Sequence, residues 1–421
     1  MPPSKLTLLI IVGLTLVAVS YALILQPAVQ TWTGSHILQY YSQIQTWLHP
    51  PQRVSFSTSG AVTISPLQPL EFDPPLLQST PLAQTSTPFP AAFVIPGGKY
   101  VSQHNRWNFC GPANLAMLLS YLDWPGSADD IARVLKPFPK DKNVMPYEML
   151  DFIRFSGWDG IIRVGGDLDI LKKLIADGFP VLVEKGPHFR NIQGNITWMG
   201  HYQVLNGYDD LNQVFTAQDS YIRADYPQPY DKLIEEWRSF NYVYLVAFQP
   251  EKRGEVLGLL GVDADETTNY QKALKKAGDE TLKLRGVDQF FAFYNYGSNL
   301  VNLRDYAGAA KAYDTAFALY DSLPEDMSIR PYRILWYQTG PYFAYYYTGR
   351  YTDVIEKATI NSIEMVRDDA PALEESYYWR GMAELKIGER QAAMDDFYSC
   401  LNYHSGFEVC LKALTDLGIS P

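Results

Sequence analysis

The chain has 421 residues, of which 47% are hydrophobic and 14% aromatic, enough for two ordinary domains with their own cores and connecting segments. Its formal net charge is -11 and no stretch is dense in Lys or Arg, which argues against binding nucleic acid or anionic lipid head groups through charge. Its three cysteines are too few for a disulfide framework and lack the paired short spacings of a zinc site.

The N-terminus carries an uncharged apolar run from Leu6 to Leu25, LTLLIIVGLTLVAVSYALIL, close to the ~20 residues of a membrane-spanning helix. Lys5 is the one basic residue before Arg53, which favours a cytoplasmic N-terminus and an extracytoplasmic remainder. A cleaved signal peptide usually has an apolar region of only about 7–15 residues and a small-x-small cleavage site. We therefore predict a single-pass transmembrane anchor over residues 1–26 in the cell envelope, or a secreted protein if this segment is cleaved.

Residues 27–96 are predicted to be a linker. The stretch SPLQPLEFDPPLLQSTPLAQTSTPFP is dense in Pro, Ser, Thr and Gln, cannot build a helix and would stay extended. It would hold the next domain away from the membrane as a tether, or act as a plain spacer with no specific partner.

Between residues 97 and 250 the pattern changes to that of a compact α+β domain that opens with a helix. Asn108 is a suitable N-cap, and the first turn holds Cys110 followed by Gly and Pro, as is favoured at a helix start. Leucines then recur at helical spacing, at Leu115, Leu118, Leu119 and Leu122. Cys110 is therefore expected to begin a buried helix.

Further along, short runs rich in β-branched and aromatic residues are separated by turn formers. They are FPVLVEKG (179–186), HYQVLNGY (201–208), QVFTAQDSY (213–221) and NYVYLVAF (241–248). We predict that these runs are strands of an antiparallel sheet.

The remainder is expected to consist of a charged, Gly-containing connection over residues 251–285 and an all-α solenoid over residues 286–421. Two segments share the offsets of 34-residue tetratricopeptide repeats; the matching residues are Phe293, Gly297, Ala309, Tyr313 and Ala316, then Tyr377, Gly381, Ala393, Phe397 and Cys400. A degenerate copy, YFAYYYTGRYTDVIEKA, lies between them, and a helix over Glu408 to Leu417 would cap the array. Small residues at these offsets let paired helices approach closely, and such a solenoid would offer a groove to a protein partner.

The segment QHNRWNFCGPANLAMLL, from Gln103 to Leu119, resembles the nucleophile motif of the bacteriocin-processing double-glycine peptidases and their stand-alone relatives, a branch of the papain-like cysteine peptidases. In that family a Gln precedes a Cys-Gly pair that opens a helix, and His and Asp follow on strands. The resemblance covers about residues 97–248. It implies a papain-like fold and a cysteine peptidase that needs neither metal nor cofactor.

Elementary chemistry supports a triad of Cys110, His201 and Asp219. A helix N-terminus stabilises a thiolate through the helix dipole and unpaired N–H groups, and His201 starts a strand directly after Gly200, where a base can reach a cleft. If residues 201–208 and 213–220 form a hairpin, opposed residue numbers sum to about 420–422, so His201 and Asp219 become cross-strand neighbours. Asp219 would then orient the imidazole.

The resemblance also assigns a role to Gln103. Its side-chain amide, together with the backbone N–H of Cys110, would donate to the oxyanion of the tetrahedral intermediate, worth about 3–4 kcal/mol per donor. Gln103 lies seven residues before Cys110, one more than the family pattern has. Asn105 and Asn108 are therefore alternative donors.

These residues also have plainer interpretations. Cys110 would pack as a small hydrophobe in an apolar helix, and His201 would be a strand histidine, but the flanking Cys-Gly-Pro and the downstream His favour a nucleophile. His104 and His188 are expected on the surface or at the cleft rim. Histidines so far apart give no metal-ligand spacing, so no metal site is predicted.

Cys400 and Cys410 are expected on two helices that flank the turn over residues 402–406. In an oxidising compartment they would form a disulfide across that turn, whereas simple packing is the alternative. The sequence leaves both open.

The motifs lead to three functional hypotheses. The first is hydrolysis of peptide bonds by an extracytoplasmic, membrane-anchored cysteine peptidase whose repeats bind a partner or substrate. The second is a catalytically silent adaptor for envelope protein assembly. The third is other amide chemistry of the same fold, as in cell-wall amidases or transglutaminase-like enzymes. The complete Cys, His and Asp set favours an enzyme.

Overall fold

A computed structural model describes residues 56, 90–104, 106, 108–138, 141–190, 196–326, 328–360 and 373–420. The predicted anchor over residues 1–26 and most of the predicted linker lie outside the described residues. The chain divides into two units, residues 1–52 with 189–197 and residues 53–188 with 198–421, and the second holds nearly all that is described. Within the described ranges, no helix has the length and apolar character needed to cross a membrane.

An α+β domain with an antiparallel sheet precedes a helical C-terminal region, as predicted. The strands of the main sheet are β1 (Ala92–Val94), β2 (Asp159–Arg163), β3 (Val181–Lys185), β6 (His201–Asp209), β7 (Val214–Asp219), β8 (Arg223–Pro229) and β9 (Tyr244–Phe248). Their order is β2-β9-β3-β6-β7-β8, with β1 also paired to β6. Every pairing is antiparallel. The four predicted strands correspond to β3, β6, β7 and β9.

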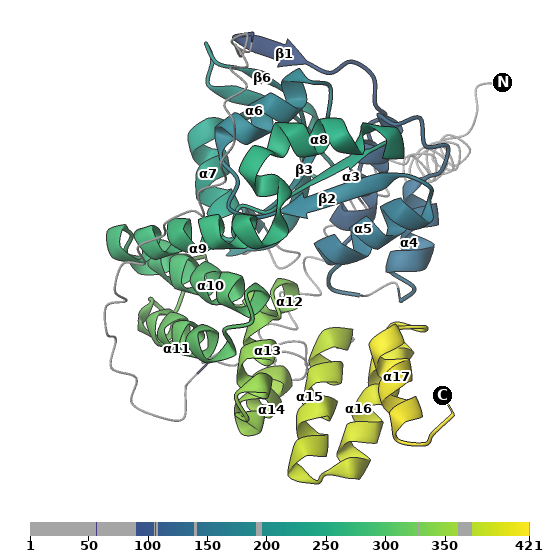
Figure 1. Ribbon diagram of the computed structural model, residues 1–421, viewed down its shortest axis with the longest axis vertical. Helices are drawn as coiled ribbons and strands as arrows, with labels where there is room; N and C mark the ends of the chain where they lie inside the picture. Colours follow the sequence, from purple (N-terminus) through teal and green to yellow (C-terminus); the bar gives the residue numbers. More distant parts are fainter. Residues whose placement is uncertain are drawn as a thin grey trace, which may run out of the picture. The chain divides into compact units, whose positions relative to one another are not determined.

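The two faces of the sheet are covered by different helices. Because alternate residues of a strand point to opposite faces, neighbouring residues of β3 contact different helices. Val181 and Val183 pack with α6 (Leu168–Ala176), α7 (Tyr230–Arg238) and α8 (Arg253–Leu260). Leu182, between them, packs on the other face with α3 (Cys110–Ser120), α4 (Ala128–Leu135) and α5 (Pro146–Phe155). Figure 1 shows these two layers of helices around the sheet.

Helix α3 begins at Cys110, and its Leu115, Leu118 and Leu119 are fully buried, so the predicted buried helix is confirmed. The prediction that Asn108 caps it is wrong. Phe109 occupies the N-cap without a side-chain hydrogen bond. Asn108 instead has a left-handed backbone with φ of 44° and donates its amide to the main-chain oxygen of Asp141 at 3.2 Å.

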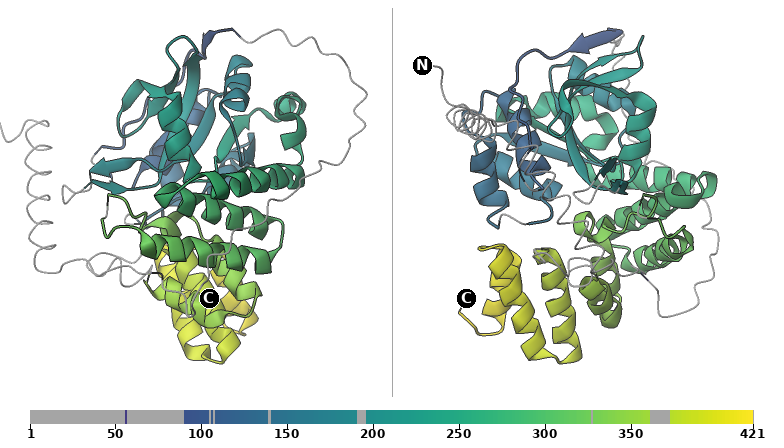
Figure 2. Two further views of the ribbon diagram at one scale, coloured as in Figure 1. Left: turned by 90° about the vertical axis from the view of Figure 1, so that its left-hand side faces the viewer. Right: turned by 180° about the vertical axis from the view of Figure 1, so that it is seen from behind.

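Helices continue from α8 to the C-terminus. They are α9 (Glu266–Lys283), α10 (Gly286–Asn302), α11 (Tyr306–Ser322), α12 (Ile334–Tyr337), α13 (Gly340–Tyr347), α14 (Tyr351–Thr359), α15 (Glu374–Ile387), α16 (Arg390–Tyr403) and α17 (Glu408–Asp416). The segment 251–285, expected to be a connection, is thus mostly the helices α8 and α9. Figure 2 follows the helices in chain order from green to yellow.

Small residues allow close helix pairing where the sequence placed them. A Cβ on Gly297 would lie 2.9 Å from the ring of Tyr313, and one on Gly381 would lie 2.8 Å from the ring of Phe397. These glycines therefore set how closely α10 approaches α11 and α15 approaches α16. The tetratricopeptide assignment itself stays a prediction.

Two further features bear on the helical region. Cys400 and Cys410 are joined by a disulfide with a Cα–Cα distance of 6.6 Å, which decides the alternative that the sequence left open. Phe56, from the predicted linker, is fully buried against Phe317 and Tyr320, with ring centroids 5.0 and 4.9 Å away. The linker is thus more than a plain spacer at this residue.

Candidate active site

The nucleophile position is set by helix α3. Cys110 is the first residue of this helix and is partly buried, so its sulfur lies where the helix dipole and the unpaired N–H groups of the first turn stabilise negative charge. Cys400 and Cys410 form the disulfide, so Cys110 is the single free thiol among the three cysteines of the chain.

His201 and Asp219 lie together at the ends of β6 and β7. Nε2 of His201 is 2.9 Å from Oδ1 of Asp219, and both side chains are buried, with 3% and 0% of their surface exposed. This bond leaves Nδ1 as the ring nitrogen available to the hydrogen bond that joins His201 to the Cys110 sulfur. The structure therefore brings the three predicted triad residues together.

The register explains this contact and reveals a residue that sequence reasoning missed. Val204 pairs with Gln218 and Leu205 with Ala217, and a bulge follows before Gly207. One step beyond the first pair, Gln203 faces Asp219, so the contact of His201 with Asp219 is diagonal. Nε2 of Gln203, which is fully buried, donates to Oδ2 of Asp219 at 3.0 Å.

The Asp219 carboxylate is held by several donors. Its Oδ1 also accepts the main-chain N–H groups of Tyr221 and Ile222, each at 2.9 Å. Burial alone would raise the pKa of Asp219, but the charge and hydrogen bond of His201, then the charge of the buried Lys185 and the Ile222 N–H, hold that pKa well below its ordinary value of 3.8. Asp219 is therefore ionised at neutral pH.

Opposing effects also act on the other two groups. Burial raises the pKa of the Cys110 thiol, but the hydrogen bond and charge of His201, the N–H of Tyr202 and the charge of Lys136 outweigh burial, so this pKa lies below its ordinary value of 9.0. Burial lowers the pKa of His201, yet Asp219 first and Cys110 second raise it to about 9. The pair is thus set up to hold a thiolate beside an imidazolium.

Gln103 is anchored beside the triad by Ser220, the residue after Asp219. Its main-chain N–H donates to the main-chain oxygen of Ser220 at 2.9 Å, and its side-chain Oε1 accepts from the Ser220 hydroxyl at 2.6 Å. The amide nitrogen is the part of the side chain left to donate, as an oxyanion donor must. Asn114 of α3 donates to the Ser220 hydroxyl and to the main-chain oxygen of Cys110, at 2.8 and 2.9 Å.

The other candidates are placed differently. Asn105 lies outside the described residues, and the Asn108 amide is engaged with Asp141. His104 is exposed, with its ring 5.5 Å from that of Tyr221, and His188 is exposed at the start of the short strand β4 (His188–Arg190). Gln203 follows His201 by two residues on one strand, so period-two reasoning would have found it, whereas the role of Ser220 has no sequence signal.

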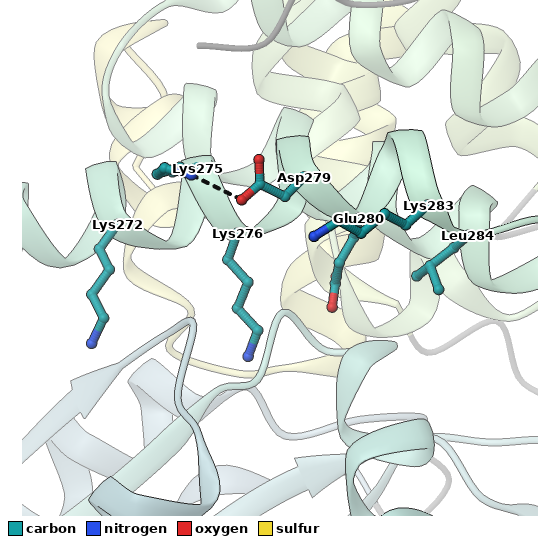
Figure 3. Close-up of a pocket in the computed structure, with 7 residues that line it drawn as sticks. All are labelled: Lys272, Lys275, Lys276, Asp279, Glu280, Lys283 and Leu284. Atoms are coloured by element: carbon teal, nitrogen blue, oxygen red, sulfur yellow. Dashed lines mark hydrogen bonds and ion pairs between the residues drawn. The ribbon is translucent and has the colours of Figure 1, made fainter. Parts of the chain in front are cut away.

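A depression elsewhere is lined by one side of α9, and Figure 3 shows its residues, Lys272, Lys275, Lys276, Asp279, Glu280, Lys283 and Leu284. Nζ of Lys272 is 2.7 Å from Oδ2 of Asp263. Nζ of Lys276 donates to the main-chain oxygen of Gly166 at 2.7 Å and lies 3.2 Å from the ring centre of Tyr242. The contacts of Lys276 hold α9 against the α+β domain, and no triad residue lines the depression. We assign these residues to packing.

Comparisons with known proteins identify one matching family. A model of the Peptidase_C39 like family matches residues 97–245, about a third of the chain, and supports a papain-like cysteine peptidase fold for this part. No curated protein matches the chain well enough to count as a relative. A crystal structure described as a C39-like peptidase from Bacillus anthracis aligns with 14% identity and a TM-score of 0.31, over 38% of this chain and 98% of that chain.

Proposed function

We propose that the protein is a cysteine peptidase that hydrolyses peptide bonds through Cys110, His201 and Asp219. The observation that carries the proposal is the buried His201, which is hydrogen-bonded to the ionised Asp219 at 2.9 Å and also to the Cys110 sulfur, whose pKa is lowered. Such an arrangement yields a nucleophilic thiolate at neutral pH. The family match over residues 97–245 supports the same class.

The reaction follows from the position of each group. The Cys110 sulfur attacks the carbonyl carbon of the substrate, and the resulting oxyanion accepts hydrogen bonds from the Gln103 amide and the Cys110 N–H. His201 donates its proton to the leaving amine as the C–N bond breaks, which leaves a thioester on Cys110. Water then attacks the thioester while His201 takes the proton from that water, and the carbon–sulfur bond breaks to release the acid and restore the thiolate–imidazolium pair.

The rest of the chain is proposed to place this activity outside the cytoplasm. The apolar segment over residues 6–25 would anchor the chain in a membrane with the catalytic domain on the extracytoplasmic side. The disulfide between Cys400 and Cys410 is in keeping with an oxidising compartment. The helix pairs after residue 286 would act as tetratricopeptide-like repeats that bind a protein partner or the substrate.

The proposal is tested by alkylating the full-length protein with iodoacetamide from pH 4 to pH 8. Because Cys110 is the single free thiol, the intact mass reports its modification directly. We expect rapid labelling well below the pH at which an ordinary thiol reacts, lost in His201→Ala, because the imidazolium that stabilises the thiolate is gone. His188→Ala is the matched control and should label like the wild type.

A wild-type thiol that labels slowly, with the pH dependence of a free cysteine, would contradict the proposal. The chain would then be better described as a peptidase-like adaptor. If Cys110 is reactive, cleavage of a peptide library that disappears in Cys110→Ala distinguishes peptide hydrolysis from cell-wall amidase or transglutaminase-like chemistry.

A further inference from the structure

The loop between α4 and α5, residues 136–145, meets the C-terminal helices at a point far along the chain from the triad residues on β6 and β7. The ring of Phe138 lies 5.2 Å from that of Tyr403, and Tyr147 at the start of α5 donates its hydroxyl to Glu375 of α15 at 3.3 Å. Figure 1 shows α4 and α5 next to the part of the helical region that holds α15, α16 and α17.

Three potential metal ligands converge at this contact. The three residues are Asp141, Glu374 and His404, and each offers one ligand atom within 4.8 Å of the other two. Nδ1 of His404 is 2.7 Å from Oε1 of Glu374. Asp141 and Glu374 are almost completely buried, with 1% and 2% of their surface exposed. His404 is partly buried, with 12% of its side chain exposed, so the cluster has a route to solvent.

An unsatisfied oxygen points to a ligand at this cluster. Oδ1 of Asp141 accepts the N–H of Asn143 at 3.3 Å. Its Oδ2 is buried and accepts no hydrogen bond from any residue that the structure describes. Leaving such an oxygen without a partner is costly, and buried charges in proteins are normally paired or coordinated to a metal.

The charge around the cluster also favours a cation. Glu148 and Glu375 add two carboxyl groups close to Asp141 and Glu374. Lys136 lies beside them, and its Nζ donates to the main-chain oxygen of Asp141 at 2.8 Å. Ionised carboxyl groups crowded together in this way repel one another. A divalent ion would relieve this repulsion directly.

We propose that Asp141, Glu374 and His404 bind a divalent transition-metal ion, for which Zn²⁺ is the best match. An imidazole beside carboxylates disfavours Ca²⁺ and Mg²⁺, which take oxygen ligands, whereas Zn²⁺ accepts both groups in a tetrahedral site. Zn–ligand bonds near 2.1 Å place neighbouring ligands roughly 3.4 Å apart. This lies within the 4.8 Å that encloses the present ligand atoms, although the 2.7 Å contact between His404 and Glu374 has to widen. Water would fill the fourth position.

The proposed ion would tie the C-terminal repeats to the loop that supports the nucleophile. The main-chain oxygen of Asp141 accepts from both Lys136 and Asn108, and Lys136 also donates to the main-chain oxygen of Asn108 at 3.3 Å. Asn108 lies two residues before Cys110. The site is therefore structural, and it is independent of whether Cys110 is catalytic.

The test uses the full-length Cys110→Ala protein, because the Cys110–His201 pair would itself attract zinc. We expect calorimetric titration with Zn²⁺ to show one ion per chain, and Co²⁺ to give the visible absorption of a tetrahedral site. In His404→Gln and Asp141→Asn the zinc affinity should fall at least about tenfold, the lower end of what loss of supporting groups around a metal costs. Glu389→Gln, an exposed glutamate at the start of α16, should bind as the parent does.

Two results would overturn the proposal: a parent protein that binds no Zn²⁺ at 100-fold excess, or binding that survives unchanged in both ligand variants. If those variants fail to fold, hydrogen exchange of the parent decides the matter. Zinc should then slow exchange in residues 141–145 and 400–404, and protection confined to other segments would count against the site.

Discussion

At the residue scale, Gln203 is a positioning residue for the triad, since it contacts Asp219 and not the reacting atoms. Replacing it in Gln203→Leu removes one donor from the buried carboxylate, so Asp219 holds the His201 ring less firmly. We expect the alkylation rate of Cys110 at pH 6 to fall about tenfold, in line with the loss of one supporting hydrogen bond. Gln391→Leu, at an exposed position of α16, is the control.

The buried pair of Asp219 and His201 makes stability depend on pH. Because the pKa of Asp219 is held well below 3.8 in the folded protein, its contribution is fully present above pH 4 and is lost as the pH falls further. His201, with a pKa raised to about 9, is protonated throughout this acidic range. Asp219→Asn should therefore destabilise the protein by about 3–5 kcal/mol at pH 6, as for other broken buried pairs, and by less at pH 2.5.

Urea denaturation of the wild type and Asp219→Asn between pH 6 and pH 2.5 measures this difference. Asp231→Asn, at an exposed position of α7, should give no comparable pH-dependent difference. A cost of Asp219→Asn that stays constant or grows toward low pH would show that the carboxylate is not stabilised as a buried ion.

The sequence located the candidate site well where local rules apply. The helix start identified Cys110, and hairpin counting identified the neighbourhood of His201 and Asp219 with an error of one or two positions. The error arises at the turn, which closes with Asp209 paired to Val214, and the bulge before Gly207 only partly offsets it. Ser220 and Asn114 could not be found in this way, since their roles depend on two segments that meet only in the folded chain.

At the scale of elements, the start of α3 depends on a left-handed residue. Asn108 has φ of 44°, a conformation that Gly adopts without strain and that costs other residues about 1–2 kcal/mol. Asn108→Ala should therefore unfold at a lower urea concentration than Asn108→Gly, although both lose the amide bond to Asp141. An Asn108→Ala protein at least as stable as Asn108→Gly would contradict this account of the turn.

Strands were easier to predict than the helices that follow them. The run that became β9 and the first three residues of β3 are apolar because both faces of the sheet are covered, and this signal is strong. The sequence predicts a connection where α9 lies, because the surface of this helix is charged and its buried residues are few and small, chiefly Ala273, Leu274 and Ala277. Its anchor on the sheet domain is Lys276, a polar residue whose partner Gly166 is 110 residues away in sequence.

At the scale of the whole molecule, the helical region supports the α+β domain close to the candidate site. Gln338, just after α12, donates to the main-chain oxygen of Ser239 at 2.6 Å. The ring of Tyr337, in α12, lies 5.7 Å from the ring of Trp198. A Cβ on Gly200 would lie 2.8 Å from the Tyr337 ring. Because Gly200 directly precedes His201, α12 limits the freedom of the strand that carries the base.

A buried amide pair joins the same two regions and makes them unfold together. Nδ2 of Asn241 donates to Oδ1 of Asn299 at 2.8 Å, and the reverse bond is 3.2 Å. Asn299→Ala leaves the buried Asn241 amide unpaired, which costs about 1–3 kcal/mol. We expect one calorimetric transition in the wild type and a single, lower transition in Asn299→Ala, whereas Asn302→Ala, one turn away and exposed, should unfold as the wild type does. Two separate transitions, with only the one of the helical region displaced, would mean that the regions fold independently and that α12 gives the base no lasting support.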